Sequence, residues 1–144
     1  MSEYLIYIFI FFILFGFIFS SILEYLNSKN WKDSVPDSLK DFYKESDYKK
    51  AKSYKLDRDR VSLISSLIST TLTIIFIFSG VYGKVSDYSL YYFDNPFLQS
   101  AGFFLFFLMI STIINLPISY YSIFTIEEKY GFNKSTSVSY THLR

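Results

Sequence analysis

The sequence predicts an all-α integral membrane protein, and three observations support that fold class. Hydrophobic residues make up 51% of the 144 residues, and aromatic residues make up 22%. The charged side chains are segregated, because 10 of the 14 Lys and Arg residues lie between Lys29 and Arg60. The flanking regions contain three long uncharged segments. With 5 Gly, 3 Pro and no Cys, the composition excludes collagenous, disordered and disulfide-stapled proteins.

Each uncharged segment is long enough to cross a bilayer. The segments cover residues 4–23, 61–83 and 95–126. A helix that spans the hydrocarbon core needs about 20 apolar residues. We therefore expect three transmembrane helices, over about 4–23, 61–83 and 97–120. Pro117 is expected to kink the third helix or to end it near Leu116.

The first segment is expected to be a retained helix rather than a cleaved signal peptide. Residues 1–3 contain no Lys or Arg, and no small-residue cleavage site follows the apolar stretch. The second segment carries Ser62, Ser65, Ser66 and Ser69, which form two small-xxx-small pairs. These serines predict either a close helix–helix contact or hydrogen bonds back to their own helix. No ionisable side chain lies within the segments, which disfavours a transporter or channel subunit.

The charged region, residues 24–60, is expected to be a cytoplasmic loop with one or two short helices. Pro36 suits a first helical position, and an apolar stripe of Leu39, Phe42 and Tyr43 would follow it. Ser46 or Asp47 could cap a second short helix with one face formed by Tyr48, Ala51 and Lys52. Acidic residues alternate with the basic ones, so we expect a solvated face near anionic lipid and no nucleic-acid partner.

The distribution of basic residues predicts the orientation. With three crossings, 13 Lys and Arg residues fall on the side of residues 24–60 and the C-terminal tail, and 1 falls on the other side. Basic residues favour the cytoplasm. The N-terminus should therefore face the exterior or a lumen, in a bacterial plasma membrane or the endoplasmic reticulum. Tyr88, Tyr91 and Tyr92 precede the third helix, as expected for an interfacial aromatic belt.

Residues 126–134, Ile-Glu-Glu-Lys-Tyr-Gly-Phe-Asn-Lys, closely resemble the IEEKxGFNK signature of type I CAAX prenyl proteases and their bacterial relatives. The spacing Tyr48-x-x-Ala51-x-x-Tyr54, with Arg60 and a Ser-rich helix start, is similar to the family's first cytoplasmic loop. The resemblance covers residues 1–136. It implies a multi-spanning zinc metalloendopeptidase that encloses an intramembrane chamber and cleaves prenylated CaaX substrates. In that family, an HExxH pair and a downstream Glu hold the zinc.

This chain departs from that pattern because it contains no HExxH. Its one histidine, His142, has no partner histidine at the required spacing, so we assign no catalytic and no metal-binding residue. Zinc is implied only for the full-length family member, and the chain is expected to be inactive alone. The residues that match the signature are expected to form an ordered membrane-exit segment, in which Gly131 allows a left-handed turn: Glu127, Glu128, Lys129, Gly131, Phe132 and Asn133.

The sequence therefore predicts the N-terminal membrane portion of a CAAX-protease-like zinc metalloendopeptidase, over residues 1–136. Its expected partners are the lipid bilayer and the C-terminal helices and catalytic domain of a parent protein. Residues 137–144 show no periodicity and are expected to be either a non-native tail or a natural terminus. The alternative is a stand-alone three-helix membrane protein that binds or regulates a partner.

Overall fold

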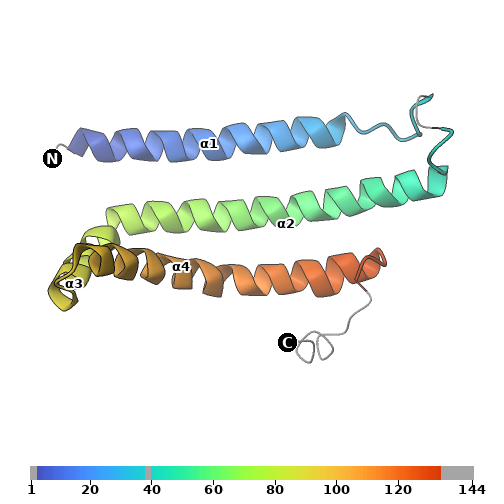
Figure 1. Cartoon of the computed structure of the whole chain (residues 1–144). Helices are drawn as coiled ribbons and strands as arrows, with labels where there is room; N and C mark the ends of the chain where they lie inside the picture. Colours follow the sequence, from blue (N-terminus) through green and yellow to red (C-terminus); the bar gives the residue numbers. More distant parts are fainter. Residues whose placement is uncertain (1–2, 38–39, 134–144) are drawn as a thin grey trace. The chain divides into compact units, whose positions relative to one another are not determined.

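The computed structural model describes residues 3–37 and 40–133 and is helical (Figure 1). Its elements are α1 (Glu3–Lys29), α2 (Glu45–Phe78), α3 (Val81–Tyr92), α4 (Pro96–Tyr121) and η2, a π-helix (Ser122–Glu127). No strand occurs within these ranges. The all-α prediction is confirmed.

Three of the helical stretches are long and apolar enough to cross a membrane. They are Tyr4–Lys29, Glu45–Phe78 and Pro96–Glu127. Their large apolar side chains are mostly exposed, and the buried apolar residues in the described part of the chain are Val35, Ile126 and Tyr130. Such exposure would be unfavourable in water but is expected where lipid surrounds the helices.

The helices begin and end at different residues from those expected. α1 continues to Lys29 and α2 begins at Glu45, so much of the expected 24–60 loop is helical. The second short helix expected near Ser46 is the start of α2 itself. Ion pairs one turn apart, Lys49–Glu45 and Lys55–Asp59, support this charged stretch. Because residues 45–78 contain no Gly or Pro, extending the existing helix requires no new nucleation.

The first short helix, expected after Pro36, is not an α-helix. Residues 40–42 form a turn, and Phe42 and Tyr43 are exposed. Leu39, the remaining member of the expected stripe, lies outside the described residues. A stretch this short needs packing against its apolar side to be stable, and Phe42 has little such packing.

The second span ends at Phe78 rather than near residue 83. Gly80 adopts a φ of 69°, in the left-handed region, and α3 begins at the next residue. Ser79 Oγ donates a hydrogen bond to the Ile75 carbonyl at 2.7 Å and helps to satisfy the helix end. Glycine adopts this conformation without a steric penalty, so the helix is interrupted here.

The third helix has nearly the expected bounds of 97–120, but of the two outcomes expected at Pro117, an end near Leu116 does not occur. α4 continues through Pro117 to Tyr121, and η2 extends the helical path to Glu127. The sequence remains apolar on both sides of the proline. In lipid, leaving the helix would expose more unpaired backbone groups than the single hydrogen bond that proline removes, so continuation costs less.

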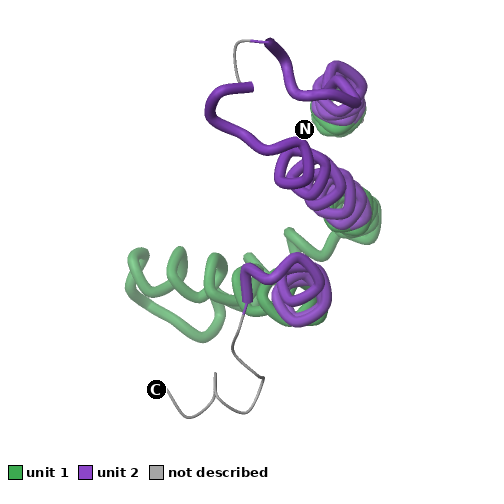
Figure 2. The backbone as a smooth tube through the Cα atoms, turned by 90° about the vertical axis from the view of Figure 1, so that its right-hand side faces the viewer, with its two compact units in different colours: residues 1–17, 65–117 green, residues 18–64, 118–144 purple. Residues whose placement is uncertain are grey.

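The chain divides into two compact units, coloured separately in Figure 2. Unit 1 comprises Met1–Phe17 and Ser65–Pro117, and unit 2 comprises Ile18–Ile64 and Ile118–Arg144. The division falls within α1, α2 and α4. Unit 2 holds the charged part of α2 and the signature-like residues, so the candidate site is described within it.

Candidate functional site

The signature-like residues begin at the end of η2, continue helically through Glu128 and Lys129, and then form an ordered turn from Tyr130. The Glu127 carbonyl accepts hydrogen bonds from the amides of Phe132 at 2.8 Å and Asn133 at 3.2 Å. The Gly131 amide donates to the Glu128 carbonyl at 2.9 Å. Gly131 has a φ of 74°, which confirms the predicted left-handed turn. A non-glycine residue would be strained at this position.

Asp57 on α2 is the main polar partner of this turn. Lys129 Nζ lies 2.7 Å from Asp57 Oδ2, and the Tyr130 hydroxyl donates to the same oxygen at 2.8 Å. Tyr130 is 7% exposed, whereas the Lys129 side chain is 61% exposed. The hydrogen bond to Asp57 raises the pKa of Lys129. The carboxylate therefore joins a buried hydroxyl and a solvated ammonium to α2.

Aromatic packing supports the same contact. The Tyr54 ring lies 5.4 Å from the Tyr130 ring and 4.7 Å from the Phe132 ring, measured between centroids. Lys50 Nζ lies 5.8 Å from the centroid of the Phe132 ring. Lys50, Tyr54 and Asp57 recur at helical spacing, so one side of α2 receives the whole turn. We call this arrangement the α2–turn contact; its members are Lys50, Tyr54, Asp57, Lys129, Tyr130 and Phe132.

The remaining signature residues act mainly through the backbone. Asn133 Nδ2 donates to the Ile123 carbonyl at 3.2 Å and ties the turn back to η2. The carbonyls of Glu127 and Glu128 accept the hydrogen bonds that close the turn. Ile126, within η2, is 4% exposed. Short π-helical segments are rare and often occur at functional sites.

A second set of contacts joins the end of α1 and the residues after it to α2. Trp31 stacks on Tyr48, with centroids 5.5 Å apart. Lys52 Nζ donates to the Trp31 carbonyl at 3.0 Å and to Asp33 Oδ1 at 2.7 Å. The hydrogen bond from Lys52 lowers the pKa of Asp33. Tyr48 and Tyr54, which belong to one sequence pattern, therefore contact different partners.

Sequence reasoning missed Asp57 and Tyr130 as the centre of the site. The tyrosine pattern and the signature-like string are both visible in the sequence, but their direct contact depends on how α2 packs against the turn. The available signal was that Asp57 lies three residues after Tyr54 and so shares its side of a helix. The spacing is informative only if one helix includes both Tyr54 and Asp57, which precede the expected start of the second span at residue 61.

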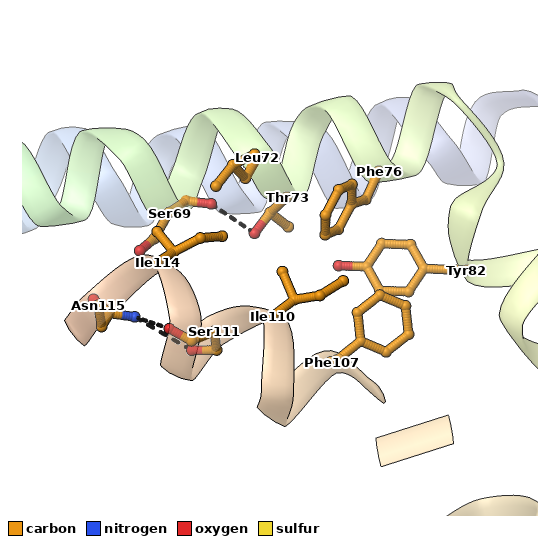
Figure 3. A pocket seen from close by; sticks show the side chains of 10 residues that line it. All are labelled: Ser69, Leu72, Thr73, Phe76, Tyr82, Phe107, Ile110, Ser111, Ile114 and Asn115. Atoms are coloured by element: carbon orange, nitrogen blue, oxygen red, sulfur yellow. Dashed lines mark hydrogen bonds between the residues drawn. The ribbon is translucent and has the colours of Figure 1, made fainter. Parts of the chain in front are cut away.

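In unit 1, the serine-rich part of α2 makes a different kind of contact. Ser65 Oγ donates to Asn115 Oδ1 on α4 at 3.2 Å, as expected for a polar helix–helix contact. Thr73 Oγ1 instead donates to the Ser69 carbonyl of its own helix. A cavity of about 180 Å³ lies beside these residues, and the Tyr82 hydroxyl points into it (Figure 3). Tyr82 stacks on Phe107 with centroids 4.7 Å apart.

The described residues do not fit a zinc site. No group of three or more His, Cys, Asp or Glu side chains within residues 3–37 and 40–133 could hold a metal ion. His142, the one histidine of the chain, lies outside these ranges. Asp57 is the only carboxylate of the α2–turn contact, and one carboxylate is fewer than the three or four protein ligands of a zinc site.

Comparisons with known proteins identify the family of this chain. Residues 24–142 match the family described as "CAAX prenyl protease N-terminal, five membrane helices". The CAAX prenyl protease 1 homolog of Dictyostelium discoideum is 32% identical over 143 residues, covering 94% of this chain and 33% of that protein. The homolog of Homo sapiens is 33% identical over 109 residues, covering 71% of this chain and 23% of that protein.

A solved structure is also similar. The crystal structure of S. mikatae Ste24p matches with a TM-score of 0.80 and 26% identity, covering 95% of this chain and 33% of that one. The chain thus spans about a third of the Dictyostelium relative and of the solved structure. It belongs to the CAAX prenyl protease N-terminal family and corresponds to the N-terminal membrane region of CAAX prenyl protease 1.

Proposed function

We propose that this chain is the membrane-embedded, non-catalytic part of a zinc metalloendopeptidase that cleaves prenylated CaaX peptides. The observation that carries the proposal is that the α2–turn contact joins the two sequence segments that resemble this family. Family membership over residues 24–142 supports it. The zinc ligands and the general base would come from the part of the relatives that this sequence does not span, about two-thirds of the Dictyostelium protein.

The proposed role of the α2–turn contact is positional. Asp57 and Tyr54 hold the segment that follows α4 against α2, so the chain leaves the membrane in one defined direction. The direction of this segment would set the direction of any catalytic helices that follow it in the chain. A displacement of about 1 Å at a catalytic group can cost about 100-fold in rate, so a rigid exit segment would affect activity without contacting substrate.

A chimera tests the proposal. This chain would replace the corresponding N-terminal third of the Dictyostelium CAAX prenyl protease 1 homolog, and membranes would be assayed for cleavage of a farnesylated CaaX peptide. We expect the chimera to cleave the peptide and this chain alone to leave it intact. An Asp57→Asn chimera should lose activity, whereas Asp41→Asn, at an exposed position, should retain it. A chimera that inserts and folds but remains inert would contradict the proposal.

The proposed topology places the N-terminus outside or in the lumen, with residues 24–60 and the C-terminal tail in the cytoplasm. The 13-to-1 distribution of basic residues supports it. Because the chain has no Cys, a single substitution to Cys introduces one thiol whose accessibility can be measured without background labelling of the chain. With the chain in the plasma membrane of intact bacterial cells, we expect Ser46→Cys to be protected from an impermeant maleimide and Asp94→Cys to be labelled. The reverse pattern would overturn the orientation.

A further inference from the structure

The helix α3 carries an exposed face of three tyrosines and two opposite charges. Lys84, Asp87, Tyr88, Tyr91 and Tyr92 line one open depression of about 470 Å³. Their spacing, i, i+3, i+4, i+7 and i+8, places all five on one side of the helix. We call this the α3 tyrosine face. We infer that it binds the phosphocholine headgroup of a membrane lipid.

The position of α3 in the chain supports a lipid ligand. With 12 residues, α3 is about 18 Å long, too short to cross a hydrocarbon core of about 30 Å. It connects two candidate spans, since α2 ends at Phe78 and α4 begins at Pro96. A short helix between two consecutive spans is held at one surface of the bilayer. Lipid headgroups are therefore the most concentrated small ligands around this face.

The exposed aromatic area indicates that a partner covers it. Tyr88, Tyr91 and Tyr92 are 64%, 81% and 71% exposed. The rings of Tyr91 and Tyr92 lie 5.1 Å apart at 87° and form two walls of a corner. Aromatic corners of this kind bind quaternary ammonium groups, because the negative ring faces attract a cation that cannot donate hydrogen bonds.

The charges of Lys84 and Asp87 are complementary to the phosphate and the trimethylammonium group of phosphocholine. Asp87 lies one turn before Tyr91 and can face the trimethylammonium group, and Lys84 can contact the phosphate. Neither side chain forms an ion pair with another described residue, so both charges remain available to a ligand. A purely anionic headgroup would leave Asp87 uncompensated. An ethanolamine headgroup would keep its hydration and its hydrogen bonds, because its primary ammonium group is a donor.

Lipid retention by the purified chain of residues 1–144 tests the inference. The protein would be reconstituted in nanodiscs with equal phosphatidylcholine, phosphatidylethanolamine and phosphatidylglycerol, then released into detergent for native mass spectrometry. We expect phosphatidylcholine to be retained about threefold or more over the other two lipids. Tyr88→Leu/Tyr91→Leu/Tyr92→Leu should abolish this preference. Replacement of the same three residues by Phe should preserve it, because the ring faces remain.

Two further variants complete the test. Tyr4→Leu/Tyr7→Leu/Tyr25→Leu removes three similarly exposed tyrosines from α1 and should leave the preference unchanged. Asp87→Asn removes the carboxylate charge at nearly constant size and should reduce retention of phosphatidylcholine. If the triple Leu variant fails to insert into the membrane, the result for Asp87→Asn tests the inference by itself. Equal retention of the three lipids, a preference for phosphatidylglycerol, or a preference that survives both Asp87→Asn and the Leu substitutions would overturn the inference. The readout is independent of proteolysis.

Discussion

The two halves of α2 make contacts of different chemistry. Its apolar half joins α4 through one neutral hydrogen bond, from Ser65 to Asn115, beside apolar and aromatic side chains. Its charged half receives the turn after η2 through a carboxylate with two donors and through stacked aromatic rings. A neutral interhelical hydrogen bond in a membrane contributes about 0.6 kcal/mol, whereas a hydrogen bond to a charged group contributes about 1.5–3 kcal/mol.

The two halves of α2 therefore meet different requirements. The apolar half must only be compatible with lipid and with its neighbour, so small polar residues suffice. The charged half lies beyond the uncharged segment, where water competes for every polar group, and it uses burial of Tyr130 to make the Asp57 contact specific. Four predictions test the comparison, ordered from the largest expected effect to the smallest.

Asp57→Ala should cause the largest loss of stability, about 2 kcal/mol, because it leaves the buried Tyr130 hydroxyl without its acceptor. Denaturant titration in mixed micelles would measure this loss. Trp31, the single Trp, stacks on Tyr48 and reports on unit 2. The matched control is Asp41→Ala at an exposed position, expected within about 0.5 kcal/mol of the parent. Equal effects of the two variants would show that Asp57 has no special role.

Gly131→Ala should destabilise the turn by about 1 kcal/mol, because its φ of 74° is unfavourable for a residue with a Cβ atom. Gly83→Ala should instead stabilise the protein slightly. Gly83 lies within α3, and a Cβ atom there would meet nothing within 4 Å. Opposite signs for these two substitutions in the same unfolding assay are the expected result, and a stabilising Gly131→Ala would refute the importance of the left-handed turn.

Ser65→Ala should cost about 0.6 kcal/mol, since it removes the single hydrogen bond to Asn115. Ser66→Ala, at the neighbouring exposed position, is the control and should have no measurable effect. Reversible unfolding in bicelles would compare the two. A Ser65→Ala effect as large as that of Asp57→Ala would remove the proposed contrast between the halves of α2.

The smallest effect concerns pH and the Asp33–Lys52 pair. The hydrogen bond from Lys52 lowers the pKa of Asp33 from its ordinary 3.8. The pair therefore contributes fully above that ordinary value, and the contribution disappears as the pH falls through the lowered pKa. Asp33→Asn should be slightly less stable than the parent at pH 7, and the difference should vanish at strongly acidic pH. A difference that persists there would show that charge is not the cause.

Much of the fold could be predicted from the sequence. The lengths of the uncharged segments predicted three spans, and the glycine of the signature-like string predicted the left-handed turn at Gly131. A helix start near Ser46 was expected, but the sequence did not predict that this charged helix is continuous with the second span as α2 (Glu45–Phe78). The sequence also left open whether Pro117 kinks or ends the third helix, since the effect of a proline depends on the lipid around the helix.

The sequence by itself predicted an integral membrane protein with three candidate spans, and its short motifs indicated the family to which the chain belongs. These properties follow from local composition and from short residue patterns. The tertiary structure alone decided that Asp57 and Tyr54 meet the turn at residues 127–133, more than 70 positions away along the chain. Contacts between distant segments depend on how helices pack against each other, and hydropathy patterns carry little information about packing.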